Sequence, residues 1–292
     1  TSQITNCIFT ENSANSGGAI RNNFSNPTIS YCTFTNNTAA VQDGGAIYNN
    51  TSSPNISHCS FSGNHAVSDA GSIFNTGSSP TITNCTFTGE SADERAGCIL
   101  NRNNVNGRSN ATIENCEFTG SQSADGGAIY TLVSDATFIN CVFLANEASS
   151  NGGAVYHTTS STADFVNCSF SGNSSPSGGA FFNNTTLHIT NSILWGNDAS
   201  IFGGATVNYS IVEGGFVGTG NLDADPNFVD QPAIGLGTNG DLRLADPSPA
   251  YNTGNDADVP VGITTDLDNN PRIALDQVDM GAYESIVPLL DD

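Results

Sequence analysis

Residues 29–47 read ISYCTFTNNTAAVQDGGAI, and variants of this phrase occur eight times in the first two hundred residues with a period of about 26 residues. A typical copy has an isoleucine, a cysteine three positions later and a phenylalanine two positions after the cysteine, and it closes with Gly-Gly-Ala-Ile. The cysteines of the first seven copies are Cys7, Cys32, Cys59, Cys85, Cys116, Cys141 and Cys168. A short repeat rich in β-branched and aromatic residues, without helical periodicity, predicts one coil of a parallel β-solenoid.

The spacing within the phrase predicts how each coil turns. A flat strand would send residues three positions apart to opposite faces, so the isoleucine and the cysteine can both face inward only if the chain bends between them. We expect the bend at the residue before each cysteine position, which is Asn6, Tyr31, His58, Asn84, Asn115, Asn140, Asn167 and Asn191. Three short strands per coil would then form internal ladders with a spacing of roughly 4.8 Å. The predicted fold class is all-β, a parallel β-helix of about eight to nine coils with a less regular C-terminal cap.

The recurring cysteines and asparagines are interpreted as structural. A column of stacked thiols fills a core as small apolar residues, and disulfides between neighbouring coils are the alternative. Cys98 replaces the alanine of the Gly-Gly-Ala-Ile phrase in the fourth coil. Stacked asparagine amides can bond to one another at the turns, and one such column is Asn12, Asn37, Asn64, Asn146, Asn173 and Asn197, with Glu90 and Ser121 at the two interruptions.

The charge of the chain limits its partners. The 292 residues include 28 carboxylates and six basic residues, all of them arginine, so the formal net charge is -22. This charge repels polyanions, so nucleic acid and anionic membrane surfaces are not expected as partners. No apolar run approaches the length of a membrane span, so no membrane insertion is predicted in this segment. Cations, neutral glycans and other protein surfaces remain as partners.

The repeat pattern divides the chain into two regions. The phrase decays after Gly204, and the rest of the chain is rich in carboxylates and proline. We predict β-helix repeats over residues 1–212 and an acidic capping segment over residues 213–292. The sequence begins inside a repeat without a methionine, which indicates a processed product or a piece of a longer protein. As given, its first coil would be open.

Two sets of motifs resemble known families. Gly-Gly-Ala-Ile combined with Phe-x-x-Asn, as in residues 34–37 and 170–173, resembles the repeats of chlamydial polymorphic outer-membrane proteins, which are surface adhesins. The tail motifs, residues 266–272 (DLDNNPR) and 279–284 (DMGAYE), are similar to the closing segment of secreted bacterial right-handed parallel β-helix proteins. The resemblances imply a right-handed parallel β-helix and an extracellular or cell-surface location. Neither implies a set of catalytic residues.

One row of residues is a candidate binding surface. The position after each Gly-Gly-Ala-Ile phrase is mostly aromatic, with Tyr48, Phe74, Tyr130, Tyr156 and Phe182, and in other coils it is Arg21, Leu100 and Val207. If the isoleucines face inward, alternation sends this row outward as an exposed stripe suited to glycan stacking or lateral packing. The alternative is that the row is core and the isoleucines lie outside.

Two short motifs are candidate calcium ligands. Asp223, Asp225 and Asn227, and likewise Asp266, Asp268 and Asn270, place oxygen ligands at alternate positions. Both lack the glycine and the glutamate of an EF-hand, so a simpler stabilising calcium site is the prediction.

The predicted function is a non-enzymatic, extracellular structural or adhesive β-solenoid. It would be a building block of a cell surface or filament, binding a host or glycan surface or associating head-to-tail through its open first coil. The alternative is a carbohydrate-active enzyme, either a polysaccharide lyase or a glycoside hydrolase. The fourth coil favours it by gathering charged residues, namely Asp93, Glu94, Arg95, Arg102 and Arg108, with Glu114 and Glu117 following.

Overall fold

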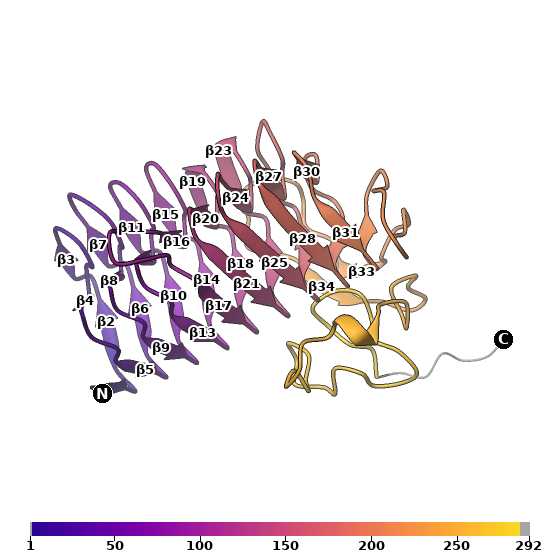
Figure 1. Ribbon diagram of the computed structural model, residues 1–292, viewed down its shortest axis with the longest axis horizontal. Coiled ribbons are helices and arrows are strands. Elements are labelled where there is room, and N and C mark those ends of the chain that lie inside the picture. The colour runs from indigo at the N-terminus through magenta and orange to yellow at the C-terminus, as the bar shows by residue number, and fades with distance from the viewer. Residues whose placement is uncertain (1, 287–292) are drawn as a thin grey trace.

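The computed structural model describes residues 2–286 and is a stack of β-strand coils with a less regular segment beside its last coils (Figure 1). Nearly all strands pair in parallel with the strand one coil away, in register. No α-helix occurs within residues 2–286. The predicted all-β parallel β-helix is confirmed.

Four parallel sheets run along the stack, which we call sheets A to D. Sheet A contains β1 (Gln3–Thr5), β5 (Thr28–Ser30), β9 (Asn55–Ser57), β13 (Thr81–Thr83), β17 (Ala111–Glu114), β21 (Asp135–Ile139), β25 (Thr162–Val166), β28 (Thr186–Thr190) and β31 (Thr206–Asn208). Sheet B contains β2 (Ile8–Thr10), β6 (Thr33–Thr35), β10 (Ser60–Ser62), β14 (Thr86–Thr88), β18 (Glu117–Thr119), β22 (Val142–Leu144), β26 (Ser169–Ser171), β29 (Ile193–Leu194) and β32 (Ile211–Val212). Sheet C contains β3 (Ser13–Ala14), β7 (Thr38–Ala39), β11 (His65–Ala66), β15 (Ser91–Ala92), β19 (Gln122–Asp125) and β23 (Glu147–Asn151). Sheet D contains β4 (Ile20–Asn23), β8 (Ile47–Asn50), β12 (Ile73–Thr76), β16 (Ile99–Arg102), β20 (Ile129–Leu132), β24 (Val155–His157), β27 (Phe181–Asn183) and β30 (Ile201–Phe202).

The prediction of three strands per coil was wrong by one. Sheet C is the additional sheet, and its first four strands are only two residues long. Such short strands carry too few residues for an alternating pattern to be recognised. Because sheets A and B have nine strands, sheet D eight and sheet C six, the number of complete coils is lower than the predicted eight to nine.

The predicted bend and core ladders are confirmed. The residue before each cysteine position is left-handed, with φ near 50° from Asn6 to Asn191, and this turns sheet A into sheet B. The cysteine and phenylalanine columns both lie in one core cluster, and successive rings such as Phe34 and Phe61 stack with centroids 4.7 Å apart. All eight cysteines are free thiols, so the disulfide alternative is excluded.

The asparagine ladder is also confirmed as an internal structural device. Its amides bond from coil to coil, as in the 2.9 Å contact from Asn37 Nδ2 to Asn64 Oδ1. At the first interruption, Glu90 takes the place of asparagine and is completely buried. Its Oε2 accepts hydrogen bonds from the Asn64 backbone N–H at 3.1 Å and the Ser72 hydroxyl at 2.5 Å. The position of Ser72 in the Gly-Gly-Ala-Ile phrase is alanine in most other coils. The serine at this position therefore supplies a hydrogen bond to the buried Glu90 carboxyl.

The segment after the last coil does more than close the end of the stack. Residues 208–222 close it, since the backbone N–H groups of Ser210 and Leu222 bond to Asn221 Oδ1 and Ser210 O. Residues 225–286, which we call the lateral segment, pack beside the last coils (Figure 1). This segment contains the antiparallel pair β33 (Phe228–Asp230) and β34 (Asp241–Leu244) and the 3-10 helix η1 (Asp256–Asp258). The predicted cap therefore covers a side of the β-helix as well as its end.

Candidate functional site

The aromatic row lies on the outer face of sheet D, as predicted. The isoleucines beside it, Ile47, Ile73, Ile99 and Ile129, are fully buried in the main core. The row itself belongs to a separate apolar cluster outside that core, which includes Tyr48, Phe74, Tyr130 and Tyr156. The alternative, with the isoleucines outside, is excluded.

The row is not a uniformly exposed stripe, however. Phe74 and Leu100 have no exposed surface, and Tyr130 is 8% exposed. Leu100 interrupts the ring stack, and two arginines of the fourth coil lie against the rings on either side of this gap. The guanidinium of Arg102 lies 4.6 Å from the centroid of Phe74, and that of Arg95 lies 5.5 Å from the centroid of Tyr130. The prediction of exposure is therefore wrong for the middle of the row.

The row is exposed at both ends. At its N-terminal end, Arg21 is exposed and its guanidinium lies 5.2 Å from the ring centroid of the half-buried Tyr48, whereas the C-terminal end is aromatic throughout. Tyr156 and Phe182 are half-buried, and Phe202 is 50% exposed. Their rings form one continuous stack with centroid separations of 4.8 Å in both steps. We call these three residues the aromatic ridge.

Phe202 was missed from the sequence because the last coil is shortened. The 26-residue register predicts Val207 as the last member of the row, whereas Phe202 pairs with Phe182. Val207 instead pairs with Ile189 in sheet A and is buried in the main core. The signal that could have located Phe202 is the Ile-Phe dipeptide at 201–202, which repeats the apolar-aromatic pair at 181–182.

Charged residues flank the buried part of the row. Asp69 is buried and accepts a 2.9 Å hydrogen bond from Arg95 Nε. Burial raises the pKa of Asp69 to about 6, although the Arg95 charge acts in the opposite direction. Burial likewise raises the pKa of Asp43, with Arg102 opposing it. Perturbed carboxyls of this kind occur at catalytic sites and also in structural ion-pair networks.

Glu94 forms a 3.5 Å ion pair with the same Arg95, but the other charged residues of the fourth coil do not converge on Asp69. Arg108 forms a 2.7 Å ion pair with Asp135, and Asp93 lies 3.9 Å from His65 Nε2. Glu117 lies away from Asp69 and lines a pocket beside the lateral segment. Of the predicted enzyme cluster, the fold therefore brings Glu94, Arg95 and Arg102 together beside the aromatic row, where they meet Asp69, which the sequence did not single out.

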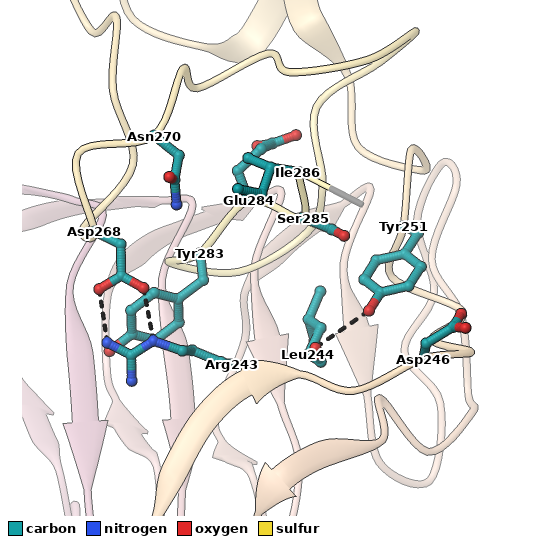
Figure 2. A pocket seen from close by; sticks show the side chains of 10 residues that line it. All are labelled: Arg243, Leu244, Asp246, Tyr251, Asp268, Asn270, Tyr283, Glu284, Ser285 and Ile286. Carbon is teal, nitrogen blue, oxygen red and sulfur yellow. Dashed lines mark hydrogen bonds and ion pairs between the residues drawn. The ribbon is translucent and has the colours of Figure 1, made fainter. Parts of the chain in front are cut away.

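Both predicted calcium motifs have carboxylate oxygens engaged with the protein, two in the first motif and four in the second. Asp223 accepts from the Gly214 backbone N–H and Asp225 from that of Asn227. Asp268 forms two 2.6 Å contacts with Arg243, and Asn270 lies beside it (Figure 2). No group of three or more His, Cys, Asp or Glu side chains able to hold a metal occurs in the described part of the chain. Calcium binding stays a prediction.

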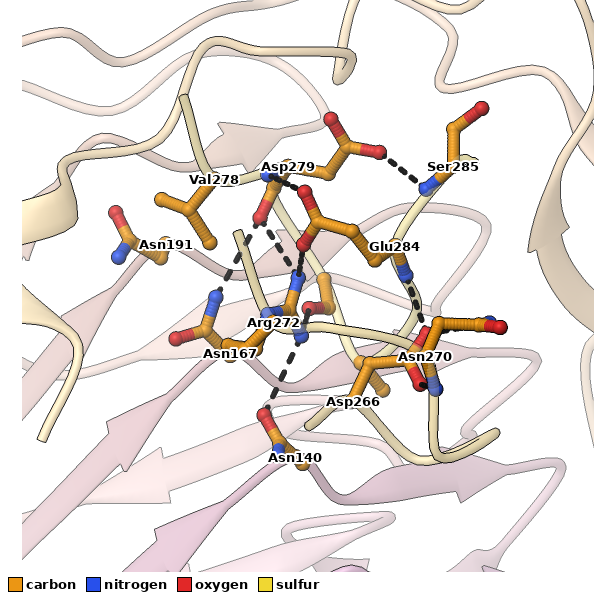
Figure 3. A network of polar contacts seen from close by, with 12 residues as sticks. Asn140, Asn167, Asn191, Asp266, Asn270, Arg272, Val278, Asp279, Glu284 and Ser285 are labelled. Atoms are coloured by element: carbon orange, nitrogen blue, oxygen red, sulfur yellow. Dashed lines mark hydrogen bonds and ion pairs between the residues drawn. The ribbon is translucent and has the colours of Figure 1, made fainter. Parts of the chain in front are cut away.

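Asp266 belongs to a buried network that attaches the lateral segment to the coils (Figure 3). It is fully buried and accepts hydrogen bonds from the backbone N–H groups of Asn270 and Glu284, both at 2.7 Å. At the centre of the network, Arg272 forms a 2.6 Å ion pair with Glu284, and both side chains are 1% exposed.

The network contacts the bend column of the coils. Arg272 donates to Asn140 Oδ1 at 3.3 Å, and the Asn167 amide donates to the Asp279 carbonyl at 3.4 Å. Asn191 accepts from the Asn255 backbone N–H at 2.7 Å. The asparagines that turn these three coils therefore also hold the lateral segment.

Comparison with protein families agrees with this architecture. The chain matches the model described as right handed beta helix region over residues 1–143 and 45–217, and it belongs to that family. The predicted right-handed parallel β-helix is thereby confirmed. Comparisons with curated proteins and with solved structures gave no match. In residues 2–286 there is no helix long and apolar enough to cross a membrane.

Proposed function

We propose that this protein is a non-enzymatic, extracellular adhesive β-solenoid that presents the aromatic ridge to a glycan or protein on another surface. The observation that carries the proposal is the stacked and partly exposed row of Tyr156, Phe182 and Phe202 on the outside of sheet D. A ridge built on paired strands is rigid, so little conformational entropy is lost when a partner binds it. The acidic chain disfavours polyanionic partners, which leaves neutral glycans and protein surfaces.

The stacking geometry restricts how the ridge can bind. Rings in a continuous stack cover one another's faces, so most of the ridge presents ring edges to a partner. The terminal ring, Phe202, has no further ring stacked beyond it in the described residues. A sugar ring or a partner's aromatic side chain would therefore stack on Phe202 and contact the edges of Tyr156 and Phe182.

Removing ridge side chains should weaken binding without unfolding the coils. We expect Phe202→Ala and Tyr156→Ala each to weaken binding by about tenfold or more, as is typical of aromatic residues at the centre of interfaces. The measurement is binding to an array of neutral glycans and to immobilised extracellular-matrix proteins. Tyr31→Ala is the matched control, because Tyr31 is an aromatic residue, 59% exposed, in the bend between sheets A and B. Unchanged binding in both ridge variants, or an equal loss in the control, would contradict the proposal.

Head-to-tail association into filaments is the other form of this function. It requires a surface that covers the first coil of a neighbouring copy. The lateral segment is a poor candidate for that role, because its apolar residues Phe228, Leu242 and Met280 are already buried against its own coils. Lateral association through the ridge is favoured instead, and electron microscopy of concentrated protein distinguishes side-by-side pairs from end-to-end fibres.

A carbohydrate-active enzyme is the second candidate. The observation in its favour is the raised pKa of Asp43 and Asp69 beside Arg95 and Arg102. Against it, Asp69 is 1% exposed and already paired with Arg95, which leaves little access for a glycosidic oxygen. Turnover of neutral and acidic polysaccharides, with and without calcium, that disappears in Asp69→Asn would favour the enzyme over the adhesin.

A further inference from the structure

The lateral segment contains a pocket that the aromatic ridge does not explain, and its lining includes Asp268 and Asn270 of the second predicted calcium motif. Its volume is about 310 Å³, and it lies between β34, the turn at 268–270 and residues 283–286 (Figure 2). This size is at the lower end of pockets that bind small molecules. Tyr251, Tyr283 and Leu244 form much of its wall.

The guanidinium of Arg243, which is the charged hydrogen-bond donor of this pocket, already bonds to two carboxylates. Arg243 donates from Nε and one terminal nitrogen to Asp268, both at 2.6 Å, and from the other terminal nitrogen to Asp241 at 2.9 Å. Its guanidinium also lies 4.7 Å from the centroid of Tyr283. With these contacts made, Arg243 has little capacity left to attract an anion.

The unused polar groups of the pocket are acceptors. The Asp246 carboxylate forms no hydrogen bond or ion pair within residues 2–286, and the Asn270 Oδ1 atom accepts none there. Tyr251 donates its hydroxyl to the Leu244 carbonyl at 3.2 Å and also shares a hydrogen bond with the Ser285 side chain, so its hydroxyl is engaged and the open acceptors are those of Asp246 and Asn270. Burial raises the pKa of Tyr251, and the charge of Asp246 contributes in the same direction. The Asp246 carboxylate is therefore close enough to affect the Tyr251 hydroxyl.

We propose that this pocket binds a small organic ammonium ion. The Asp246 carboxylate, the Asn270 amide oxygen and the ring of Tyr251 are the environment that stabilises such a cation, through charge attraction and contact with the aromatic ring. The net charge of -22 raises the local concentration of cations around the protein. An anion would meet the carboxylates of Asp246 and Asp268, and the Arg243 guanidinium beside them already bonds to Asp241 and Asp268.

The wall composition favours an organic cation over a metal ion. Calcium takes six to eight oxygen ligands, whereas Asp246 is the one carboxylate of this pocket that is not already engaged within the described residues. Leu244 and Tyr251 supply apolar surface that a hydrated metal ion cannot use. An alkyl or ring body on the ammonium group would cover this surface and gain from its burial.

The test compares a cation with its uncharged analogue. Choline and 3,3-dimethyl-1-butanol have nearly the same shape but differ in charge, and their affinities can be measured by calorimetry on the full chain. We expect choline to bind at least about tenfold more tightly, and Asp246→Asn to remove this preference. Asp230→Asn is the matched control, because Asp230 is an exposed carboxylate of β33 outside the pocket.

Three outcomes would overturn the proposal. These are equal affinity for choline and its analogue, equal loss of choline binding in Asp246→Asn and Asp230→Asn, and absence of choline binding to the wild-type chain. Calcium binding that depends on Asp246, without choline binding, would also overturn it and would favour the predicted calcium site near Asp268 and Asn270. None of these results depends on the aromatic ridge, so the adhesive function is tested separately.

Discussion

Replacing Arg272 by alanine is expected to detach the lateral segment from the side of the coils. Its guanidinium is 1% exposed and bonds to Glu284 at 2.6 Å, to the Gly281 carbonyl at 3.1 Å and to Asn140 at 3.3 Å. Removing one partner of a buried ion pair leaves the other charge uncompensated, and such changes typically cost about 3–5 kcal/mol. The same change also leaves Asn140 Oδ1 and the Gly281 carbonyl without this donor.

A single tryptophan makes this detachment measurable. Trp195 is the only tryptophan in the chain, and it packs against the apolar cluster formed between the lateral segment and the coils. In Arg272→Ala, we expect a red-shifted tryptophan emission and protease cleavage within residues 225–286, while the far-ultraviolet circular dichroism of the coils is retained. The coils should survive because the main core, which contains the stacked phenylalanines, does not include the lateral segment.

Arg243→Ala is the matched control for this experiment. Arg243 also lies in the lateral segment and pairs with two carboxylates, but its side chain is 47% exposed. Exposed ion pairs contribute about 0–1 kcal/mol, so this variant should keep its tryptophan emission and resist the protease. Equal effects of the two substitutions would show that Arg272 does not fix the segment.

The coils were predictable because each is determined by a few residues that recur. Cys32, Phe34 and the bend at Tyr31 occupy the same environment as their counterparts 26 or 27 residues later, so the repeat itself carries the information. The lateral segment has no repeat, and its position depends on contacts between residues more than a hundred positions apart, such as Arg272 and Asn140. Residue patterns alone do not encode such pairings.

One signal for the lateral segment was nevertheless present in sheet B. The outward residue between cysteine and phenylalanine is polar in the second to fourth coils, as in Thr33, Ser60 and Thr86, and is apolar in Val142. The first coil is an exception, because its Ile8 is apolar and 77% exposed. In the last two coils the equivalent position is Ile193 and Ile211, and these two residues and Val142 are all buried under the lateral segment. An apolar outward position in a parallel sheet indicates a covered face.

The burial of the aromatic row was beyond the reach of the sequence pattern. Strand alternation correctly places Phe74 and Tyr130 outside the main core. It does not show that the gap at Leu100 is flanked by Arg95 and Arg102, because these contacts depend on side-chain conformations that have no periodicity. The exposed aromatic end of the row, with Phe202, therefore had to be found from the structure.

Replacing Glu90 by glutamine is expected to stabilise the protein at pH 8 and to remove part of its dependence on pH. Burial raises the pKa of the Glu90 carboxyl from 4.5 to about 8, with the hydrogen bonds from Ser72 and Asn64 opposing the shift. The folded protein therefore holds this proton more tightly than the unfolded chain. The resulting stabilisation is complete below pH 4.5 and is lost progressively as the pH rises to about 8. At about 1.4 kcal/mol per pH unit, the loss is at most roughly 5 kcal/mol.

Glutamine occupies the volume of a protonated glutamate and carries no charge at any pH, so the variant lacks this loss. The free energy of unfolding of Glu90→Gln relative to wild type should be near zero at pH 4.5 and should favour the variant by several kcal/mol at pH 8. Taking the difference between the two proteins cancels the contribution of the other carboxylates. Glu11→Gln is the matched control, because it makes the same change at an exposed glutamate of the first coil. A constant difference for Glu90→Gln would mean that the buried carboxyl titrates alike in the folded and unfolded chains. The interruption of the asparagine ladder would then have no role in the pH dependence of stability.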